Sequence, residues 1–586
     1  MKKNIVLLLY ILSVFIPVSC SDFLSTDNLT EKTNETFPIT EDDYKQAIAA
    51  VYAAQKSCYY DQINSFVSMS NYLDDDHIAG GRALFDDPAI RATERYQVRN
   101  LDAYSVPWSN YYTGIFRANF VLESLEKNGN ALSDAARNNI EGQARYLRAS
   151  LYFDLTRLFG EVPLKLSTAS SNPPRVSIDS CFAFIASDLK RAIEILPSTS
   201  FQAINKATDL FNANKWAAEA MAGRVFLFYT GHYKKSELPL FEGGAINRDQ
   251  VLGWLHDVID NGGYRLVNDF RNLWLYALAN RGSADDYKFA SDNNLSWIGE
   301  KGDNTEAIYT ISFSALGENL NFNRFAHSVS CTVGGLFPFG NGGGMSAVNP
   351  KVYNEWDSDD LRRAGSIWNV RDFETEGIEF SETPAPNSGK FYFNSQSNME
   401  ETGFHQKKYS HIYVKVDGAR VAANAIVNGI ATKNGQSDSF IGIYIMRFSD
   451  VLLMAAELGS PNAQSYYNRV RSRGYYANHG DTSLENTPYY KAVSLENIQE
   501  ERRHEFAFEG VRAWDIRRWG IEEQQITKYK TDVPVYRFGL PEVITIKYRT
   551  ETKGLLPIPL NQINLSNGVL TQNEGWDTND AIYSGN

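Results

Sequence analysis

The sequence predicts a mainly α-helical protein in which pairs of helices form a scaffold, interrupted by a large irregular mixed α/β insertion. Helical periodicity is strong in the early and late parts of the chain. Two helical segments begin near Ile178 and Asn214, roughly 36 residues apart, which is close to the period of tetratricopeptide-like helix pairs. Between about Gly263 and Ser439 this periodicity fades.

The longest predicted helix runs from about Ser133 to Phe159. Leucines recur at steps of three and four from Leu147 to Leu158, and aromatic residues occupy a second face, so this helix packs on two sides. A glycine follows directly and ends the helix. An earlier helix begins after Thr40, where three acidic residues suit the positive end of the helix dipole. Further helical patterns cover residues 441–458, 462–473 and 494–519.

The predicted insertion is rich in glycine, asparagine and aromatic residues. Its short alternating runs at 307–311 and 412–416 predict short strands. Because binding residues concentrate on loops that a rigid scaffold positions, we expect the ligand-binding residues in such loops.

The N-terminus predicts an exported, lipid-anchored protein. Residues 1–19 join two lysines to an apolar run that is too short to span a bilayer core of about 30 Å, as in a cleaved signal peptide. Ser19 precedes Cys20, so Cys20 is predicted to carry a lipid, although Pro17 departs from the usual aliphatic residue. A secretory signal that leaves Cys20 as a free thiol is the alternative. The predicted divisions are a signal peptide at 1–19, a tether at 20–38 and a single domain at 39–586, with scaffold at about 39–262 and 440–520, insertion at about 263–439 and tail at 521–586.

Charge and cysteine content exclude several classes of protein. The net charge of −13 and the pI near 5.3 argue against nucleic acid as a partner, because phosphate binding needs clustered Lys and Arg. Besides Cys20 only three cysteines occur, far apart, which gives neither a disulfide framework nor a zinc spacing.

Catalytic motifs are not recognisable, and no cofactor is predicted. Glycine clusters near residue 340 lack the Gly-Lys-Ser/Thr end of a phosphate loop. Three carboxylate runs, at 74–76, 285–286 and 357–360, could supply the acid and base of a glycosidase. Neighbouring aspartates more often are solvated, cap helices or hold calcium, so a structural calcium ion stays possible. We interpret the charged stretch from Glu500 to Arg518 as a structural network of ion pairs.

Four ordered motifs resemble the SusD/RagB family of Bacteroidetes outer-membrane lipoproteins. They are EGQARYLRA at 141–149 with FGEVP at 159–163, RFSDVLLMAAE at 447–457, ERRHEFAFEGVRAWDIRRWG at 501–520, and LPIP at 556–559 with LTQN at 570–573. The resemblance spans the chain from Cys20 onward. One departure is NRVRSRG at 468–474, where the usual Arg-Ala-Gly ending has lost its alanine.

The resemblance implies about four tetratricopeptide-like helix pairs with a mixed insertion and no catalytic activity. It also implies a lipid-anchored protein on the outer face of the outer membrane, acting as a lid on a SusC-like TonB-dependent transporter. Such a protein delivers oligosaccharides or, in a RagB-like minority branch, peptides.

Sugar binding needs exposed aromatic rings, because the C–H face of a pyranose stacks on them while polar side chains take the hydroxyl groups. Family members place such rings in two regions, here 71–103 and 274–339. The candidates are Trp297, Tyr276, Tyr287 and Phe325 in the insertion, and Tyr72, Arg82, Tyr96 and Asn100 in the earlier loop. Trp297 is the first choice because amide side chains precede it and Gly299 frees the backbone.

Two alternatives to a glycan-binding protein stay open. A peptide-binding lid would use backbone hydrogen bonds and charged pockets, whereas the Tyr and Trp content of the insertion favours a glycan. A purely structural lid that serves barrel assembly is the other.

Overall fold

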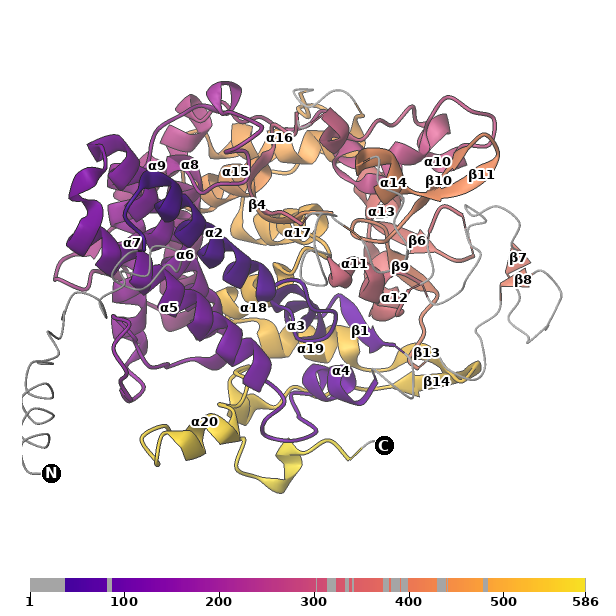
Figure 1. Cartoon of the computed structure of the whole chain (residues 1–586). Coiled ribbons are helices and arrows are strands. Elements are labelled where there is room, and N and C mark those ends of the chain that lie inside the picture. The colour runs from indigo at the N-terminus through magenta and orange to yellow at the C-terminus, as the bar shows by residue number, and fades with distance from the viewer. Residues whose placement is uncertain are drawn as a thin grey trace, which may run out of the picture.

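The computed structural model describes residues 37–81, 87–301, 303–313, 323–331, 337–339, 342–371, 379–380, 390–391, 399–428, 439, 441–477 and 483–584. The predicted mainly helical class is confirmed, and eight helices pack in sequence as four pairs (Figure 1). The pairs are α2 (Glu41–Ser57) with α5 (Ser105–Asn128), α6 (Asp134–Phe159) with α7 (Ile178–Ile195), α8 (Lys215–Tyr233) with α9 (Arg248–Asn261), and α15 (Phe448–Glu457) with α16 (Ala463–Tyr475).

Helix α6 shows how the sequence builds this array. The Ser133 side chain caps its start by accepting from the Ala136 amide at 3.2 Å, and Gly160 with φ of 74° ends it. From Ile140 onward nearly all of its side chains are buried, because α5 packs on one side and α7 on another. The Arg148 guanidinium donates to Asp188 of α7 at 2.7 Å, which fixes how the two helices align.

The segment predicted as an insertion consists of short helices and small sheets. Strand β4 (Ala307–Ile311) and strand β10 (Tyr413–Val416) confirm the two predicted strands. Strand β4 pairs antiparallel with β12 (Ile443–Arg447), which leads into α15. The other paired strands are β1 (His77–Gly80) with β5 (Met345–Val348), β6 (Ile367–Asn369) with β9 (Phe404–Gln406), β7 (Glu379–Phe380) with β8 (Lys390–Phe391), and β10 with β11 (Ala419–Ala422). The short helices are α10 (Lys288–Asp292), α11 (Arg324–Val329), α12 (Pro350–Glu355), α13 (Leu361–Ser366) and α14 (Ala423–Asn428), with 3-10 turns η4 (Phe270–Leu273), η5 (Leu275–Ala279) and η6 (Ile298–Lys301).

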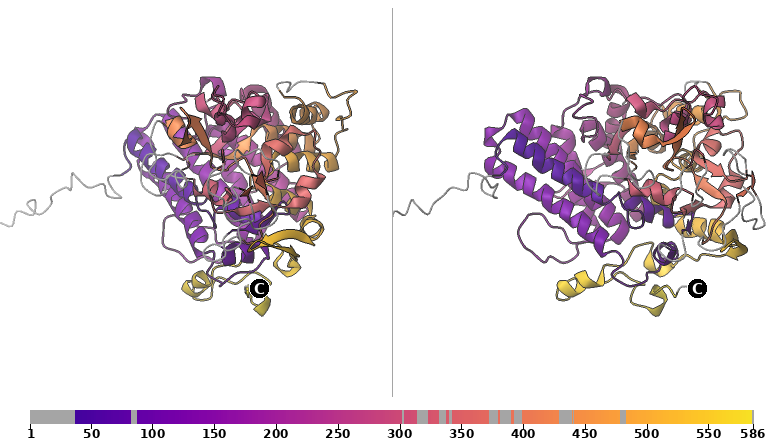
Figure 2. Two further views of the ribbon diagram at one scale, coloured as in Figure 1. Left: turned by 90° about the vertical axis from the view of Figure 1, so that its right-hand side faces the viewer. Right: turned by 45° about the vertical axis from the view of Figure 1, so that its right-hand side comes forward.

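The predicted charged helix at 494–519 is two helices. Phe508 and Gly510 adopt positive φ values of 69° and 71°, and this turn separates α17 (Leu495–Glu505) from α18 (Arg512–Trp519). The tail continues through α19 (Glu522–Lys530), the hairpin β13 (Val533–Arg537) and β14 (Leu540–Ile544), and α20 (Leu560–Leu565). In both views of Figure 2 the tail, in yellow, lies along the lower edge of the molecule. The remaining elements are α3 (Phe66–Tyr72), α4 (Asp87–Glu94), β2 (Leu238–Pro239) and β3 (Ala245–Ile246).

A buried ion-pair network joins the insertion to the helical scaffold. Glu505 of α17 accepts from Arg447 of β12 at 2.7 Å, from Arg362 of α13 at 3.1 Å, and from Arg473 of α16. Arg447 and Arg473 also donate to Glu306, beside strand β4, at 2.6 and 2.8 Å. These side chains are at most 1% exposed. The structural interpretation of the charged stretch therefore holds, but the partners of Glu505 come from distant segments and not from neighbouring turns of one helix.

Within the described residues, no helix is both long and apolar enough to cross a membrane.

Candidate functional site

An open cleft of about 280 Å³ lies where the scaffold meets the insertion. The loop between α7 and α8 contributes Phe211, and the insertion contributes Trp297 and strand β4. Trp274 and Tyr444 of β12 also line the cleft, and their rings contact each other at 5.6 Å. The cleft is therefore apolar and aromatic on several sides.

Gly299 leaves room for the Trp297 ring in the cleft. A methyl group on Gly299 would lie 2.3 Å from Cζ2 of the Trp297 indole, so only glycine leaves room for the ring in this position. The indole is half-buried, and no side chain of the described residues accepts a hydrogen bond from its Nε1–H. Trp297 thus offers both an aromatic surface and a donor to a ligand.

The polar groups of the cleft fall into two sets. Asn304 donates to the Tyr444 hydroxyl at 2.8 Å, its Oδ1 accepts from two backbone amides, and Tyr444 donates to the Leu273 carbonyl at 3.2 Å. These bonds fix the shape of the cleft. The hydroxyl groups of Thr310 and Ser312 have no hydrogen-bond partner among the described residues, so they remain available to a ligand.

The described lining carries one charged side chain, Lys408, and its charge is compensated. Its Nζ is fully buried and donates to Glu509 at 2.8 Å and to the Glu505 carbonyl at 3.0 Å. Burial lowers the pKa of Lys408 to about 8, although the Glu509 carboxylate acts in the opposite direction. The cleft therefore suits an uncharged ligand that has an apolar face and hydroxyl groups.

Of the eight candidates predicted from the sequence, Trp297 is the one that lines this cleft. The predicted exposure is wrong for five rings, which are at most 1% exposed: Tyr72, Tyr96, Tyr276, Tyr287 and Phe325. Their rings are part of the core in this conformation and present no face to a ligand.

Contacts with neighbouring side chains explain the burial of the three rings in the insertion. Tyr276 and Tyr287 pack against Phe289, with centroids 5.9 and 5.8 Å apart, and the Lys407 ammonium lies 3.9 Å from the Phe289 centroid. Phe325 packs on Tyr409 at 5.5 Å.

The candidates of the earlier loop lie elsewhere. Tyr96 donates to the Leu73 carbonyl at 3.1 Å, and the Tyr72 hydroxyl lies 3.9 Å from Sδ of Met345. Asn100 is exposed and accepts from the Asp102 amide, which makes a local turn. Arg82 and Cys20 lie outside the described residues.

Sequence reasoning missed three groups of the cleft: Phe211, Tyr444 and the hydroxyl pair of Thr310 and Ser312. Phe211 follows Leu210 within a polar loop, and this isolated apolar pair between helices is a signal that could have identified it. Tyr444 could not be identified in this way, because it precedes a helix of the scaffold and meets the cleft only through the pairing of β12 with β4.

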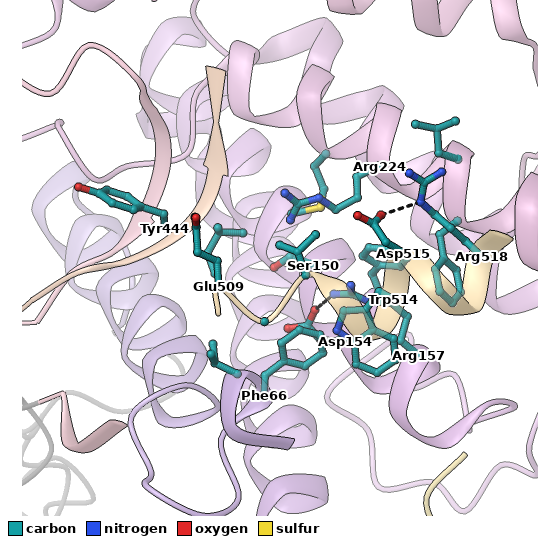
Figure 3. A pocket seen from close by; sticks show the side chains of 18 of the residues that line it. Phe66, Ser150, Asp154, Arg157, Arg224, Tyr444, Glu509, Trp514, Asp515 and Arg518 are labelled. Atoms are coloured by element: carbon teal, nitrogen blue, oxygen red, sulfur yellow. Dashed lines mark hydrogen bonds and ion pairs between the residues drawn. The ribbon is translucent and has the colours of Figure 1, made fainter. Parts of the chain in front are cut away.

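A second cavity, of about 40 Å³, lies among the scaffold helices (Figure 3). Its charged side chains pair with one another: Arg157 donates to Asp154 at 2.5 Å, and Arg518 donates to Asp515 at 2.8 Å. The Arg157 guanidinium also lies 4.0 Å from the Phe153 ring centroid. The cavity is small and its charges are paired within the core, although Nε of Arg157 and Nε of Arg224 have no hydrogen-bond partner among the described residues, so it has the character of internal packing and not of a ligand site.

The aspartate run at 74–76 is buried, which excludes solvation among the alternatives expected for such runs. Asp75 accepts from Arg512 at 2.7 Å, Asp76 pairs with Arg503 at 2.7 Å, and Asp74 bonds the His77 ring at 2.9 Å. No group of three or more ligating side chains that could hold a metal ion occurs in the described part of the chain. These carboxylates are engaged by arginine and histidine, so they provide neither a calcium site nor a free acid and base.

The fold and the cleft define a helical-repeat protein with an open aromatic cleft as its candidate site. Comparison with known families extends this description. The model of the SusD family matches residues 337–576, and a second model, described as starch-binding associating with outer membrane, matches residues 24–227. The chain therefore belongs to the SusD family.

Individual SusD-like proteins and solved structures match between 70% and 97% of this chain. SusD-like protein P25 of Formosa agariphila is 22% identical over 97% of this chain and 98% of its own. SusD-like protein P2 of the same organism is 28% identical over 70% of both chains. Surface glycan-binding protein A from Bacteroides fluxus superposes with a TM-score of 0.68 at 21% identity, covering 92% of this chain and 100% of its own. The same protein from Bacteroides thetaiotaomicron, solved in complex with laminarihexaose, gives a TM-score of 0.65 at 19% identity and covers 91% of this chain and 99% of its own.

Proposed function

We propose that this protein is a lipid-anchored, non-catalytic glycan-binding protein at the outer surface of the outer membrane, and that it delivers oligosaccharides to a SusC-like TonB-dependent transporter. The observation that carries the proposal is the cleft around Trp297, which combines an unengaged indole, unpaired hydroxyl groups and a compensated charge. Relatives that bind laminarihexaose or laminarin support a glycan as the ligand class. The family description of association with the outer membrane supports the location.

The binding proposal is tested with the full-length protein in detergent on an array of glycans and peptides, followed by calorimetry. We expect binding to an oligosaccharide whose affinity is nearly the same at low and at high salt, because an uncharged ligand forms no ion pairs for salt to screen. Affinity that collapses in salt, or binding to peptides alone, would contradict the neutral-glycan proposal and favour a peptide transporter.

The lipid anchor is tested at Cys20. Replacing the thiol in Cys20→Ala removes the attachment point of the lipid, and no helix among the described residues could cross the membrane in its place. We expect the variant to appear in the soluble fraction of cells that lack the partner transporter, while the parent protein stays with the membranes. A variant that remains membrane-bound in such cells would refute the anchor.

The partnership is tested by purification from native cells. A lid on a barrel needs a stable interface of at least about 1,000 Å², and such an interface survives mild detergent. We expect the transporter to copurify with this protein. Recovery of this protein alone would count against the partnership without affecting the glycan proposal.

A further inference from the structure

Two aromatic rings of the cleft are unengaged. Many aromatic side chains of the described residues pack against a second ring, as Trp274 does against Phe270 and Tyr444. By contrast, neither Trp297 nor Phe211 has a ring or cation contact within the described part of the chain. Phe211 is 46% exposed, although burial of such a ring is favourable. Both rings therefore keep free faces in the same cleft.

The two rings come from different segments, and hydrogen bonds order the backbone before Phe211. The turn before Phe211 is closed by backbone bonds from Asp209 to the Asn205 carbonyl at 2.8 Å and from Asn212 to the Asp209 carbonyl at 3.0 Å. An ion pair between Lys206 and Asp303 ties this loop to the strip that follows Trp297. On the other segment, Gly299 leaves room for the indole in its observed position. Backbone that is ordered before the ligand arrives loses little conformational entropy on binding.

The cleft is small for a long ligand. Its volume of about 280 Å³ is at the lower limit of sites that bury a drug-sized molecule, which have about 300–1,000 Å³. It therefore has room for one or two sugar rings, and the rest of a longer chain must extend into solvent.

We propose that Trp297 and Phe211 are the two walls of a slot that selects pyranose rings whose hydroxyl groups are all equatorial, as in glucose and xylose. Both faces of such a ring present only C–H groups, so both can lie against an aromatic ring. An axial hydroxyl, as in galactose or mannose, puts oxygen on one face. With a single aromatic wall, such a sugar can still stack through its face without the axial hydroxyl. A second wall would cover the axial hydroxyl and bury it without a hydrogen bond.

This inference rests on the proposed glycan-binding function, and the test separates the two. Oligosaccharides of glucose, xylose, galactose and mannose, each in several linkages, are measured by array and calorimetry against the full-length protein in detergent. We expect β-linked glucose and xylose chains to bind at least about ten-fold more tightly than the others, the factor that one buried, unsatisfied oxygen produces. An α linkage belongs with the others, because its axial oxygen at C1 lies on one face of the ring. We also expect affinity to stop rising beyond two or three sugar units.

Phe211→Ala is the decisive variant. Losing the second wall should lower the affinity for glucose or xylose chains by about ten-fold. Because one wall is left, the affinity for galactose or mannose chains should then lie within about three-fold of that for glucose or xylose chains. Phe211→Leu keeps apolar volume without a flat ring and should lose the same discrimination. Phe116→Ala, which removes a 51% exposed ring outside the cleft, is the matched control. It should leave both the affinity for glucose or xylose chains and the preference for them unchanged.

Each outcome decides between the claims. If wild type binds galactose or mannose chains as tightly as glucose chains, or if Phe211→Ala leaves the preference intact, the two-wall inference is overturned and the glycan-binding function survives. If wild type binds no glycan on the array, the proposed function fails and the inference fails with it.

Discussion

Glu505→Gln should destabilise the protein by about 3–5 kcal/mol, the usual cost of breaking a buried ion-pair network by removing one partner. The Glu505 carboxylate meets Arg447, Arg473 and Arg362, and all four side chains are at most 1% exposed. Glutamine keeps the shape but removes the charge and turns an N–H group toward guanidinium donors. We expect a clearly lower denaturation midpoint, measured by chemical unfolding followed by circular dichroism.

The control for this variant is Glu194→Gln. Glu194 pairs with Lys190 on the exposed face of α7, where both side chains are about 40% exposed or more and such pairs are worth about 0–1 kcal/mol. If Glu505→Gln were as stable as Glu194→Gln, the network would have no role in joining the insertion to the scaffold.

The contribution of Glu505 should also depend on pH. Burial alone would raise the pKa of Glu505, but the three arginines outweigh it, Arg473 most strongly, and hold the pKa below its ordinary range. A carboxyl group whose pKa is lowered by folding stabilises the folded state above its unfolded pKa of about 4.3 and loses that contribution as pH falls below it. The stability gap between wild type and Glu505→Gln should therefore be widest near pH 7 and should narrow in acid.

The scaffold was predictable because its information is local. Each long helix carries its own apolar periodicity and its own end signals, as α6 does with Ser133 and Gly160. The break between α17 and α18 was missed because a charged helical pattern continues on both sides of it, and the left-handed turn at Phe508 and Gly510 is set by tertiary packing.

The sequence predicts that a network of ion pairs exists but not which residues it joins. Neighbouring acids and bases in α17 and α18 indicate ion pairs, but the sequence cannot say that Glu505 meets Arg362, 143 positions away. The same limit explains the candidate site. Tyr276 and Tyr287 share their composition and loop setting with Trp297, yet Lys407 and Phe289 bury them. Which rings keep a free face is decided by contacts between distant segments.

Trp297→Ala should weaken oligosaccharide binding by about 1–3 kcal/mol, or roughly ten- to a hundred-fold, the usual cost of losing an aromatic anchor at an interface. The substitution removes both the stacking surface and the unpaired Nε1–H donor. Because the ring is half-buried and lies at the edge of the core, the melting temperature should change little. Calorimetry and thermal unfolding of the same preparations measure both quantities.

Two further variants separate a binding role from packing. Trp254→Ala removes another half-buried indole, on α9 and outside the cleft, and should leave affinity unchanged. Gly299→Ala keeps the Trp297 ring but places a methyl group 2.3 Å from its present position, so the indole must move and affinity should fall although no ligand-contacting atom is lost. If the affinities of Trp297→Ala and Gly299→Ala both equalled that of wild type, the ligand site would lie elsewhere on the protein. If Gly299→Ala bound the oligosaccharide as tightly as wild type while Trp297→Ala did not, binding would depend on the presence of the indole and not on its position over Gly299.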